Sequence, residues 1–454
     1  MIEALARIVG TANVDGSPAA RVTYAVDGTV GYRGSPAAIV FPGTGPEVAR
    51  VLGMASVKGW TVVGRGGGTS LAAGAVPPEA AIVLSTERLK QGPEIAVLDL
   101  EAVCGAGVTT GELQTRAALE GLFYPPDPSS QAVTMLGGNA ATNAGGAHAL
   151  KYGVTRDYVV ELEVALASGE LVRVERGTGS EPLLDLFIGS EGTLGIVTKL
   201  KLRLLPAPPA AKTMAAHFDG AKAATEATVA LLGKGLLPAR LEFMDEVAIR
   251  AVQAARDRGL EGVGAVLLVE FDGEEQAVRA DVEAGREVME RMGALMVKVA
   301  ETAAAAAAMW EPRGAITSSL ARLKPGKIGE DICVPRTELP GVVEAITDLS
   351  RETGLEIALF GHAGDGTLHP NIVFDPADEG EVAKVKEVMA GIARIGIEAG
   401  GVLSGEHGLG LVKKEFVPLM YDWETIGRMR ALKREMDPAG ILNPEVMWPE
   451  EPEG

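Results

Sequence analysis

The sequence predicts an α+β fold of at least two domains, with an antiparallel sheet in the second. Its 454 residues exceed what one hydrophobic core normally serves. Short strands and glycine-rich turns fill the chain up to about residue 205, and longer strands alternate with helices after the proline-rich stretch Leu205-Pro-Ala-Pro-Pro209. We therefore expect one domain at 1–208, a second at 209–422, and a C-terminal helix and tail at 423–454 that packs back on the first domain.

Each domain has its own order of elements. In the first, Thr44-Gly-Pro-Glu47 predicts a helix start, because proline is favoured at the first helical position and an acid in the first turn. Hydrophobic alternation and turn residues predict the rest. In the first domain we expect strands at 37–41, 60–64, 81–85, 95–100, 102–105, 159–166 and 170–174, and a helix at 109–119. In the second we expect strands at 213–218, 241–244, 265–271, 295–299, 331–335, 357–361 and 368–374, helices at 220–233, 246–258, 274–292, 302–322 and 337–353, and then a last helix at 424–436.

Composition excludes several classes of protein. The net charge of −19 argues against a nucleic-acid partner, since phosphate binding needs a basic face. No apolar run reaches the roughly 18 residues of a membrane span, and the N-terminus lacks the pattern of a secretory signal. The two cysteines, Cys104 and Cys333, fit a reducing cytosol. We therefore expect a cytoplasmic protein without a membrane span of its own.

The stretch Gly361–Asn371 holds two of the five histidines. Its Asp365-Gly366 pair is a strong signal for a two-residue hairpin turn. Such a turn would pair His362 with His369 on one face, with Cβ atoms about 5 Å apart, where two imidazoles can share a metal ion. The alternative is a surface hairpin with two unrelated histidines.

A second turn, Ser404-Gly-Glu-His-Gly408, favours the metal interpretation. It adds a carboxylate and a third histidine. Two histidines and one carboxylate form a ligand set that leaves positions open for substrate oxygens. We therefore expect His362, His369 and Glu406 to bind a divalent ion, of zinc or manganese type, which would lower the pKa of a substrate hydroxyl.

Three glycine-rich segments lie in the first domain. Arg65-Gly-Gly-Gly-Thr-Ser70 follows a strand, and its backbone N–H groups can converge on phosphate oxygens. It matches neither a Walker loop nor Gly-x-Gly-x-x-Gly. Gly137–Gly146 and Gly189–Ile196 are the other two. One such loop could be a plain turn, but three together predict a large, flat, phosphate-bearing cofactor lying across the domain.

These segments, with Pro125–Ser129 and Lys151-Tyr-Gly153, resemble the FAD-binding domain of the vanillyl-alcohol oxidase superfamily. With Gly361–Asn371 and Ser404–Gly410 added, the chain is similar to the group of glycolate oxidase FAD-linked subunits and D-lactate dehydrogenases, over about residues 35–445. The resemblance implies a two-subdomain PCMH-type FAD-binding domain followed by an α+β substrate domain, or cap.

The resemblance also implies which residues hold the cofactor. Members that attach FAD covalently often carry histidine where Thr69 stands, so we expect non-covalent FAD. The implied FAD-binding residues are Arg65, Gly66, Gly67, Gly68, Thr69, Ser70, Pro126, Asp127, Ser129, Gly138, Thr142, Asn143, Gly145, Gly146, Glu191, Gly192, Gly195, Ile196 and Asn443.

The activity implied is oxidation of a small 2-hydroxy acid, of glycolate or D-lactate type, to the 2-oxo acid. Arg313 matches the residue that binds the substrate carboxylate, and a planar guanidinium suits that task. Thr317, four residues on, and Asn371 are implied substrate contacts. His407 matches the residue that takes the hydroxyl proton while hydride passes to flavin N5.

Two alternatives use the same fold. One is a flavin-bearing electron-transfer subunit of a multi-protein oxidase, and the other is a non-redox FAD lyase. The paired histidine turn favours a catalytic chain. Electrons would then pass to a separate acceptor subunit or carrier protein, a homodimer is allowed, and any membrane association would come through partners.

Overall fold

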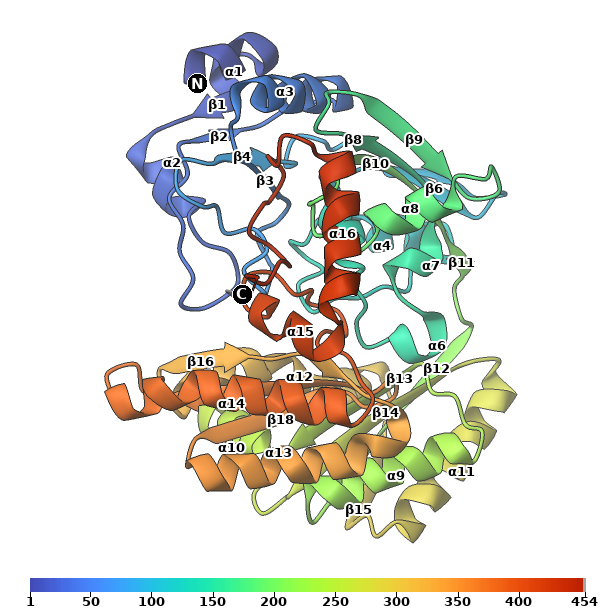
Figure 1. Cartoon of the computed structure of the whole chain (residues 1–454). Coiled ribbons are helices and arrows are strands. Elements are labelled where there is room, and N and C mark those ends of the chain that lie inside the picture. Colours follow the sequence, from blue (N-terminus) through green and yellow to red (C-terminus); the bar gives the residue numbers. More distant parts are fainter. Residues whose placement is uncertain (452–454) are drawn as a thin grey trace. The chain divides into compact units, whose positions relative to one another are not determined.

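The computed structural model describes residues 1–451, which fall into two compact units (Figure 1). Unit 1 contains Met1–Gly145, Gly153–Ala207 and the segment from Glu406 onward. Unit 2 contains Gly146–Tyr152 and Pro208–Gly405. The chain thus enters unit 2 within the proline-rich stretch, and it returns to unit 1 at Glu406, ahead of the expected position 423. Residues 452–454, the end of the expected third segment, lie outside the described range.

Unit 1 is built on two sheets and a short two-stranded ribbon. The four-stranded sheet has the order β1-β2-β4-β3, with β2, β4 and β3 parallel. The five-stranded sheet is antiparallel, with the order β5-β6-β10-β8-β9, and the ribbon pairs β11 with β7. The strands are β1 (Val14–Asp15), β2 (Ala38–Val40), β3 (Val62–Arg65), β4 (Ile82–Ser85), β5 (Glu94–Ala96), β6 (Glu101–Gly105), β7 (Leu122–Phe123), β8 (Val159–Ala165), β9 (Leu171–Glu175), β10 (Ile196–Arg203) and β11 (Leu205–Pro206).

Two helices of unit 1, α3 and α4, begin at threonines that cap them. Thr44 accepts a hydrogen bond from the Glu47 N–H at the start of α3, and Gly59 ends that helix with a φ of +64°. Thr109 and Glu112 form a capping box at α4. The helices are α1 (Ile2–Val9), α2 (Pro18–Thr23), α3 (Gly45–Lys58), α4 (Thr110–Leu119), α5 (Leu136–Thr142), α7 (Thr155–Tyr158), α8 (Glu181–Phe187), α15 (Val417–Met420) and α16 (Trp423–Met436), with 3-10 turns η1 (Thr11–Asn13) and η4 (Lys414–Phe416).

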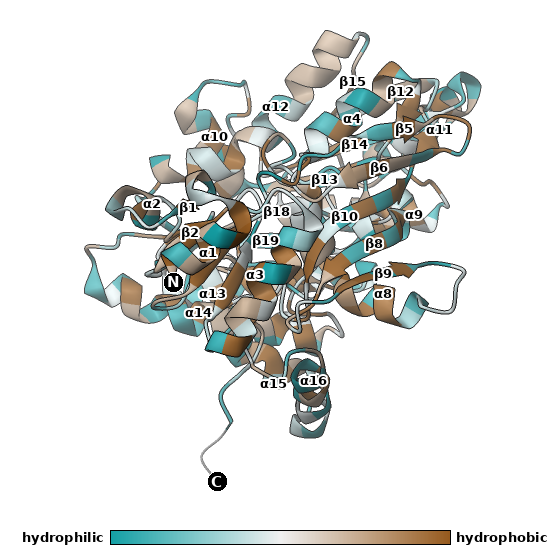
Figure 2. Ribbon diagram, turned by 90° about the horizontal axis from the view of Figure 1, so that it is seen from above, coloured by the Kyte–Doolittle hydropathy of each residue, from teal (hydrophilic) through white to brown (hydrophobic). Residues whose placement is uncertain are grey.

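Helix α16 is tied to the glycine-rich segments of unit 1 by a buried ion pair. Lys433 pairs with Asp437 and donates to the backbone oxygens of Thr193 (2.6 Å) and Leu442 (2.8 Å). Figure 2 shows the helix end-on, with hydrophilic residues over much of its surface. Since a buried charge is costly unless it is paired and hydrogen-bonded, this network fixes how the helix joins the unit.

Unit 2 contains one eight-stranded sheet, with the order β15-β12-β14-β13-β18-β19-β16 and with β17 also paired to β19. Every pairing in it is antiparallel, as predicted. The strands are β12 (Ala210–Phe218), β13 (Arg240–Asp245), β14 (Ala265–Gly273), β15 (Met296–Val299), β16 (Gly326–Gly329), β17 (Ile332–Cys333), β18 (Glu356–His362) and β19 (Thr367–Phe374).

Helices cover both faces of this sheet. In Figure 1, α11, α9, α13 and α14 lie side by side across one face. Helices α10 and α12 pack on the other, against Met244, Ala358 and Phe360. The helices are α6 (Ala149–Tyr152), α9 (Ala221–Gly233), α10 (Glu246–Ala255), α11 (Glu275–Arg291), α12 (Ala303–Ser319), α13 (Leu339–Thr353) and α14 (Glu379–Glu398), with 3-10 turns η2 (Leu320–Arg322) and η3 (Arg336–Glu338). None of the helices within residues 1–451 combines the length and hydrophobicity of a membrane span.

The hairpin β18–β19 differs from the prediction in its register. His362 pairs with Thr367, and His369 pairs with Phe360, so the expected pairing of His362 with His369 is wrong. The loop has four residues rather than two, because His362 O accepts from the Gly366 N–H (3.2 Å) and Asp365 Oδ1 accepts from the Thr367 N–H (2.9 Å). Only Gly366 of the expected turn pair has a positive φ. The two histidines still share one face, because Thr367 and His369 are two residues apart on the strand.

Candidate active site

A large cavity opens in unit 1. All three predicted glycine-rich segments line it, and so do Glu406 and His407. It encloses about 1150 Å³ of empty space, including open solvent at its mouth. The lining residues include Arg65 to Ser70, Ser129, Gly138, Thr142, Glu191, Gly192, Gly195 and Ile196 among those predicted.

The loop after β3 needs glycine at specific positions. A Cβ on Gly67 would lie 2.3 Å from Val133 O, and one on Gly68, where φ is +66°, would lie 2.1 Å from the Arg65 guanidinium. A Cβ on Gly138, by contrast, would meet nothing within 4 Å. The backbone of this loop therefore packs too closely for side chains on one side, while the helix α5 opposite leaves space for a ligand.

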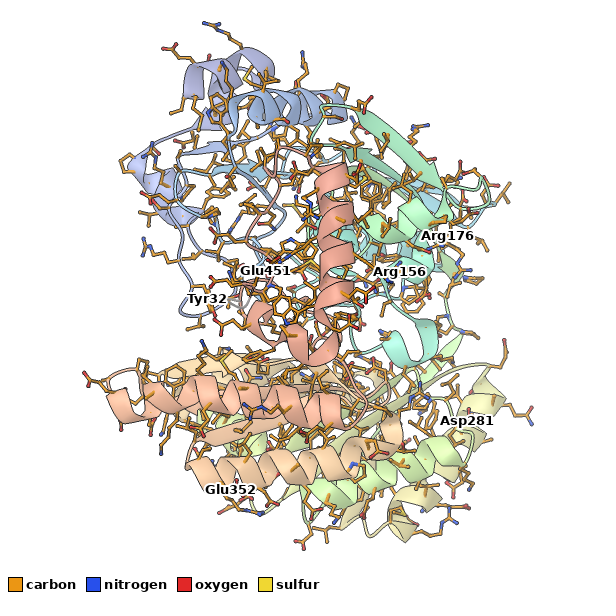
Figure 3. The ribbon with its side chains drawn as sticks, viewed as in Figure 1. Tyr32, Arg156, Arg176, Asp281, Glu352 and Glu451 are labelled. Atoms are coloured by element: carbon orange, nitrogen blue, oxygen red, sulfur yellow. The ribbon has the colours of Figure 1, made fainter. Side chains whose placement is uncertain are left out.

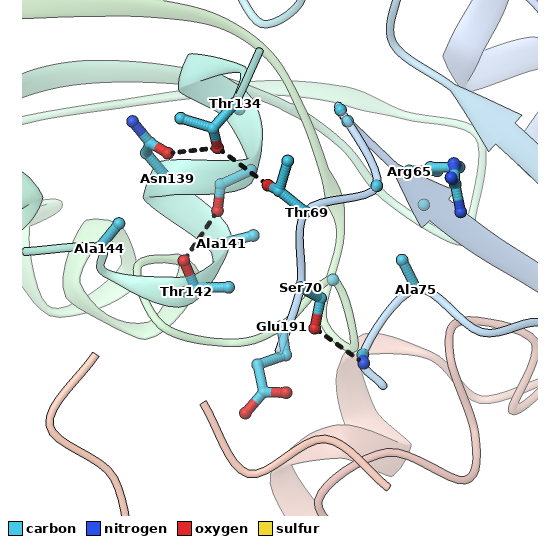
Figure 4. A pocket seen from close by; sticks show the side chains of 18 of the residues that line it. Arg65, Thr69, Ser70, Ala75, Thr134, Asn139, Ala141, Thr142, Ala144 and Glu191 are labelled. Atoms are coloured by element: carbon cyan, nitrogen blue, oxygen red, sulfur yellow. Dashed lines mark hydrogen bonds between the residues drawn. The ribbon is translucent and has the colours of Figure 1, made fainter. Parts of the chain in front are cut away.

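Hydroxyl groups order the wall beside this loop. Thr69 donates to the Thr134 hydroxyl (3.3 Å), Thr134 donates to Asn139 Oδ1 (3.0 Å), and Asn139 donates to Thr110 (2.7 Å), as Figure 4 shows in part. Ser70 accepts from the Ala72 and Gly74 N–H groups. Two of these bonds are buried side-chain pairs, so they hold the wall in one conformation.

Arg65 supplies a cation at the start of the loop. Its guanidinium donates to Val26 O (2.7 Å) and lies over the Tyr24 ring, 5.1 Å from the centroid. The Asp27 carboxylate interacts with it electrostatically. These contacts hold the Arg65 side chain in place at the start of the loop.

The segment 189–196 is fixed by Arg156 and Arg176, which Figure 3 labels beside α8. Both pair with Asp185, and Arg156 also donates to Ile188 O (2.7 Å). Glu191 follows, with a φ of +51° and its carboxylate buried. Burial raises its pKa to about 7, although the Leu409 and Gly410 N–H groups and Lys413 oppose that rise.

His407 and Glu406 belong to unit 1. His407 Nε2 lies 3.7 Å from Glu406 Oε1, and both side chains are largely buried. The two residues follow directly on Ser404 and Gly405, which in unit 2 donate to Asp331 Oδ2 at 2.7 and 3.0 Å. Glu406, the predicted metal ligand, and His407, the predicted base, are thus the first two residues after the chain leaves unit 2.

In unit 2, a buried carboxylate joins two predicted site residues. Glu242 accepts from His362 Nδ1 (2.6 Å) and pairs with Arg313 (2.7 Å). Burial would raise the pKa of Glu242, but His362 and Arg313 lower it to about 2. A carboxylate on Nδ1 is the usual second partner of a metal-binding histidine.

His369 lies next to His362 on the same face. The ring centroids are 5.0 Å apart, and their ligand nitrogens lie within 4.8 Å of each other. Asp331 Oδ1 lies 3.6 Å from His369 Nδ1. Asn371 is buried on this face and donates to His369 O (3.0 Å). Because zinc–nitrogen bonds are about 2.0–2.1 Å long, one ion can reach both histidines, so these residues fit a divalent metal.

Other predicted residues lie elsewhere. Thr317 is exposed on α12, and its backbone oxygen accepts from Lys327 (2.9 Å). Asn443 is buried outside the cavity lining, and its amide donates to Gly74 O and Glu191 O, both at 2.9 Å. Pro126, Asp127, Asn143 and Gly145 also do not line the cavity, and Gly146 belongs to unit 2.

Family comparisons agree with both units. Residues 36–175 match the family described as FAD binding domain. Residues 207–447, more than half of the chain, match the family described as FAD linked oxidases, C-terminal domain. The chain belongs to the FAD-linked oxidases. The family predicted from the sequence motifs is confirmed.

This FAD-linked oxidase has relatives of similar length. Glycolate oxidase subunit GlcD of Bacillus subtilis (strain 168) is 39% identical over 451 residues, covering 98% of this chain and 96% of that protein. The GlcD subunit of Escherichia coli (strain K12) is 36% identical over 427 residues, covering 93% and 86%. A D-lactate dehydrogenase of Archaeoglobus fulgidus is 36% identical over 418 residues, covering 89% and 90%.

Solved structures show the same fold at low sequence identity. The 4-ethylphenol oxidase of Gulosibacter chungangensis superimposes with a TM-score of 0.80 at 19% identity, covering 99% of this chain and 97% of that one. A p-cresol methylhydroxylase gives a TM-score of 0.79 at 15% identity, covering 99% and 96%. The predicted fold class, a PCMH-type FAD-binding domain with an α+β second domain, is therefore confirmed.

The cavity of this FAD-linked oxidase suits its cofactor. Close-packed glycine backbone on one side, free space at Gly138 on the other, and the Arg65 cation at one end provide room and donors for a dinucleotide. The lining residues that the sequence prediction omitted include Thr86, Pro128, Ser130, Thr134 and Asn139. Most of these lie beside predicted residues in the chain, and neighbourhood alone could have suggested them.

Glu242 is the functional residue that sequence reasoning missed. It stands between Leu241 and Phe243, in the interior of β13, whose other charged residues, Arg240 and Asp245, are at its two ends. A charged residue in the buried interior of a strand is a signal for a paired charge. Its partners, however, lie far along the chain, 120 residues away at His362 and 71 residues away (313 − 242) at Arg313, so the sequence offers no means of finding them.

Proposed function

We propose that this chain oxidises a small 2-hydroxy acid, of the glycolate or D-lactate type, to the corresponding 2-oxo acid. The observation that carries the proposal is the polar face of unit 2, where Arg313, His362, His369 and Asn371 gather around buried carboxylates. The relatives named glycolate oxidase subunit and D-lactate dehydrogenase support the same substrate class.

Arg313 is proposed to bind the substrate carboxylate. Its Nη2 pairs with Glu242, and within residues 1–451 its Nε is buried without a hydrogen-bond partner. The Phe360 ring lies below the guanidinium, 5.0 Å from its carbon. A guanidinium held on one edge and unsatisfied on another is preorganised to accept a carboxylate. Thr317 and Asn371 are proposed as further contacts of the substrate.

His407 is proposed to take the hydroxyl proton. A neutral imidazole is suited to this, because its ordinary pKa lies close to physiological pH. FAD, when bound, supplies the acceptor for the hydride that leaves the substrate's carbon. The substrate thereby loses one proton and one hydride, the hydride carrying both electrons, and its C–OH becomes C=O.

His362, His369 and Glu406 are proposed to hold a divalent ion of zinc or manganese type. Such an ion would lower the pKa of the substrate hydroxyl and assist proton removal. Glu242 would orient His362 toward it through Nδ1.

The FAD is proposed to be non-covalent, because Thr69 donates its hydroxyl to Thr134 and offers no imidazole for a histidyl bond. The proposed FAD-binding residues are those given by the sequence prediction, with Asn443 acting through the backbone of Gly74 and Glu191. Acid precipitation should release all flavin into the supernatant, and flavin that stays with the protein would contradict this part.

Electrons are proposed to leave for a separate acceptor subunit or carrier protein. Two of the relatives are named as subunits, which supports a partner of this kind. Any membrane association would come through such a partner, and a homodimer remains a proposal.

Turnover with an artificial acceptor dye tests the proposed function. We expect purified holoprotein to convert glycolate or D-lactate to glyoxylate or pyruvate, with one 2-oxo acid formed for each two electrons delivered to the dye. Formation of no 2-oxo acid from any small 2-hydroxy acid would overturn the proposal. It would leave the electron-transfer subunit or the non-redox lyase as the explanation.

A further inference from the structure

The segment 406–410 carries the proposed base but contains no helix or strand. Gly408 and Gly410 both have positive φ, at +84° and +53°. Glycine at such positions increases the conformational freedom of a loop in the unfolded state and weakens local order. A base must nevertheless be held within hydrogen-bond reach of the proton that it removes. Specific contacts must therefore hold this segment.

The Glu191 carboxylate makes such contacts within unit 1. Its Oε1 accepts from the Leu409 N–H at 2.7 Å, and its Oε2 accepts from the Gly410 N–H at 2.9 Å. A Cβ on Gly408 would lie 2.8 Å from the same carboxylate. Charge-assisted bonds from two successive N–H groups to one carboxylate are stronger than neutral ones, and they fix the backbone in two directions.

Glu191 is itself rigidly placed. Its N–H donates to Ala141 O at the end of α5 (2.8 Å), and its carbonyl accepts from Asn443 Nδ2 (2.9 Å). Its φ of +51° is uncommon for any residue but glycine and costs of order 1 kcal/mol. Gly192, directly after it, has a similar conformation. A glutamate at such a position indicates that its side chain is needed there.

The far end of the segment is bound to the first glycine-rich loop. The Leu411 N–H donates to Ala72 O at 2.9 Å, and a Cβ on Gly410 would lie 1.7 Å from that oxygen. The Lys413 side chain is buried close to Glu191 and interacts with it electrostatically. The cofactor cavity and the segment that carries His407 therefore share one set of anchors, and Glu191 is at its centre.

We propose that Glu191 is a positioning residue for His407: its carboxylate grips the Leu409 and Gly410 amides and thereby fixes the imidazole for proton transfer. This rests on the proposed function, in which His407 takes the hydroxyl proton. It is additional to the proposed FAD contact of Glu191, and both carboxylate oxygens take part in it by accepting from backbone N–H groups.

Two variants separate the effect of the two hydrogen bonds to the Leu409 and Gly410 amides from the effect of the negative charge of Glu191. Glu191→Gln keeps the size of the side chain, but its amide NH₂ would face a backbone N–H, so one of the two bonds is lost. Glu191→Asp keeps the charge on a side chain too short to reach both amides. Glu163→Gln is the matched control, because Glu163 accepts from the Thr198 hydroxyl (2.8 Å) in the five-stranded sheet of the same unit.

Hydrogen exchange and flavin reduction, measured on the holoproteins, test the proposal. We expect amide exchange at Leu409 and Gly410 to rise about tenfold or more in Glu191→Gln and Glu191→Asp and to stay unchanged in Glu163→Gln. We expect the limiting rate of flavin reduction by D-lactate or glycolate to fall about 10- to 100-fold, with little change in the substrate concentration for half-maximal rate. Should Glu191→Gln not fold, Glu191→Asp carries both measurements.

Unchanged hydrogen exchange at the Leu409 and Gly410 amides in the Glu191 variants would show that the carboxylate does not hold this segment. Faster exchange with an unchanged reduction rate would overturn the positioning role. His407→Ala separates this from the proposed function. If His407→Ala reduces its flavin at the normal rate, His407 is not the base and the positioning role fails with it, whereas a native holoprotein whose flavin no small 2-hydroxy acid reduces would overturn the proposed function itself. If only the Glu191 variants reduce normally, the positioning role fails alone.

Discussion

Glu242 is the buried charge on which the polar face of unit 2 depends. It lies directly between His362 Nδ1 and the Arg313 guanidinium, and their proximity keeps its pKa near 2 despite burial. It is therefore ionised throughout the range in which the protein functions. Its charge holds the arginine in place and sets which nitrogen of His362 faces outward.

Glu242→Gln should weaken metal binding by about 10- to 100-fold, because His362 loses its charged orienting partner. It should also destabilise unit 2, by about 3–5 kcal/mol if Arg313 remains charged and unpaired. Zn²⁺ and Mn²⁺ affinities measured by competition with a chelator, together with thermal unfolding, check both effects. Glu270→Gln is the matched control, because Glu270 pairs with Arg240 (2.6 Å) in the same sheet. Equal metal affinities in the two variants would contradict the orienting role.

His407→Ala should keep its FAD and lose its activity. The base contributes about 10²- to 10⁴-fold to proton transfer, so flavin reduction by substrate should slow by that factor. Stopped-flow absorbance measures the rate, and dithionite reduction shows that the flavin is intact. His217→Ala, a half-buried histidine on β12, should reduce at the normal rate. Normal reduction in His407→Ala would exclude it as the base.

At this scale the sequence predicts the glycine-rich lining well and the polar partners poorly. The need for glycine at Gly67 and Gly68 can be predicted, because three successive glycines after a strand indicate backbone that packs closely against its neighbours. The partners of Glu242 and Asn443 cannot be found in this way, because they lie 71 (313 − 242) or more residues away in the chain. Such pairs arise from the tertiary fold and leave no local pattern.

At the scale of elements, the hairpin β18–β19 shows how a correct inference can rest on a wrong register. The Asp365-Gly366 turn signal predicts the hairpin and places the histidines on one face, where the structure also has them. The Asp365 side chain, however, accepts from the Thr367 N–H and extends the loop to four residues. Asparagine and aspartate commonly make this bond to a backbone two residues on, in competition with a tight turn.

Strand β5 and helix α14 are two of the elements that differ from the sequence prediction. Strand β5 ends at Ala96 rather than 100, and the apolar Leu98 that suggested strand is 98% exposed. Helix α14 was not predicted, although Val385, Val388, Met389 and Ile392 have helical spacing and Asp378 caps its start. The predicted strand was too long because Leu98, although apolar, is exposed and does not belong to the sheet. Helix α14 could have been predicted from its hydrophobic spacing.

The N-cap of α10 leads to a pH prediction. Asp245 accepts from the Ala248 N–H (2.8 Å), and burial raises its pKa to about 7 from an ordinary 3.8. The unfolded chain ionises first as pH rises, so stability present below about pH 4 is lost progressively up to about pH 7. Asp245→Asn keeps the capping acceptor without this loss. The free energy of unfolding of Asp245→Asn, relative to that of the native protein, should therefore increase between about pH 4 and 7, by a few kcal/mol at most. Melting temperatures of the two proteins across this pH range measure the trend.

Asp422→Asn provides the control for this measurement. Asp422 caps α16 in the same way, accepting from the Thr425 N–H (2.7 Å), but it is exposed and its pKa is lowered by that bond. Its contribution is present above about pH 4 and is lost as the pH falls. The two variants should therefore show opposite trends, and a shared trend would contradict the assignment for Asp245.

At the scale of the whole molecule, the chain order interleaves the two units. Gly146–Tyr152 belongs to unit 2, where the Lys151 ammonium donates to Asp272 O (2.7 Å) and the Tyr152 hydroxyl donates to Asp272 Oδ2 (2.7 Å). The segment from Glu406 belongs to unit 1. The sequence predicts a boundary after residue 208 and a return to the first domain at 423. It predicts neither the excursion at 146–152 nor a return as early as 406, because neither carries a change in sequence pattern.

Removing metal with a chelator distinguishes the role of the cofactor cavity from that of the proposed metal ligands. Removing divalent metal should leave the FAD content unchanged, because the cavity lining is formed almost entirely by residues that do not bind metal. It should slow flavin reduction by substrate about 100-fold or more, and Zn²⁺ or Mn²⁺ should restore the rate. Dithionite should reduce the flavin equally in both samples. A metal-free protein that reduces at the full rate would exclude a catalytic metal.

The most direct test of the proposed oxidation is anaerobic mixing of the holoprotein with glycolate or D-lactate, without any acceptor. If His407 and Arg313 prepare the acid for hydride loss, the flavin's visible absorbance should bleach in a single turnover, and one 2-oxo acid should form for each flavin reduced. A flavin spectrum that stays unchanged with every small 2-hydroxy acid, while dithionite still bleaches it, would contradict the proposed function.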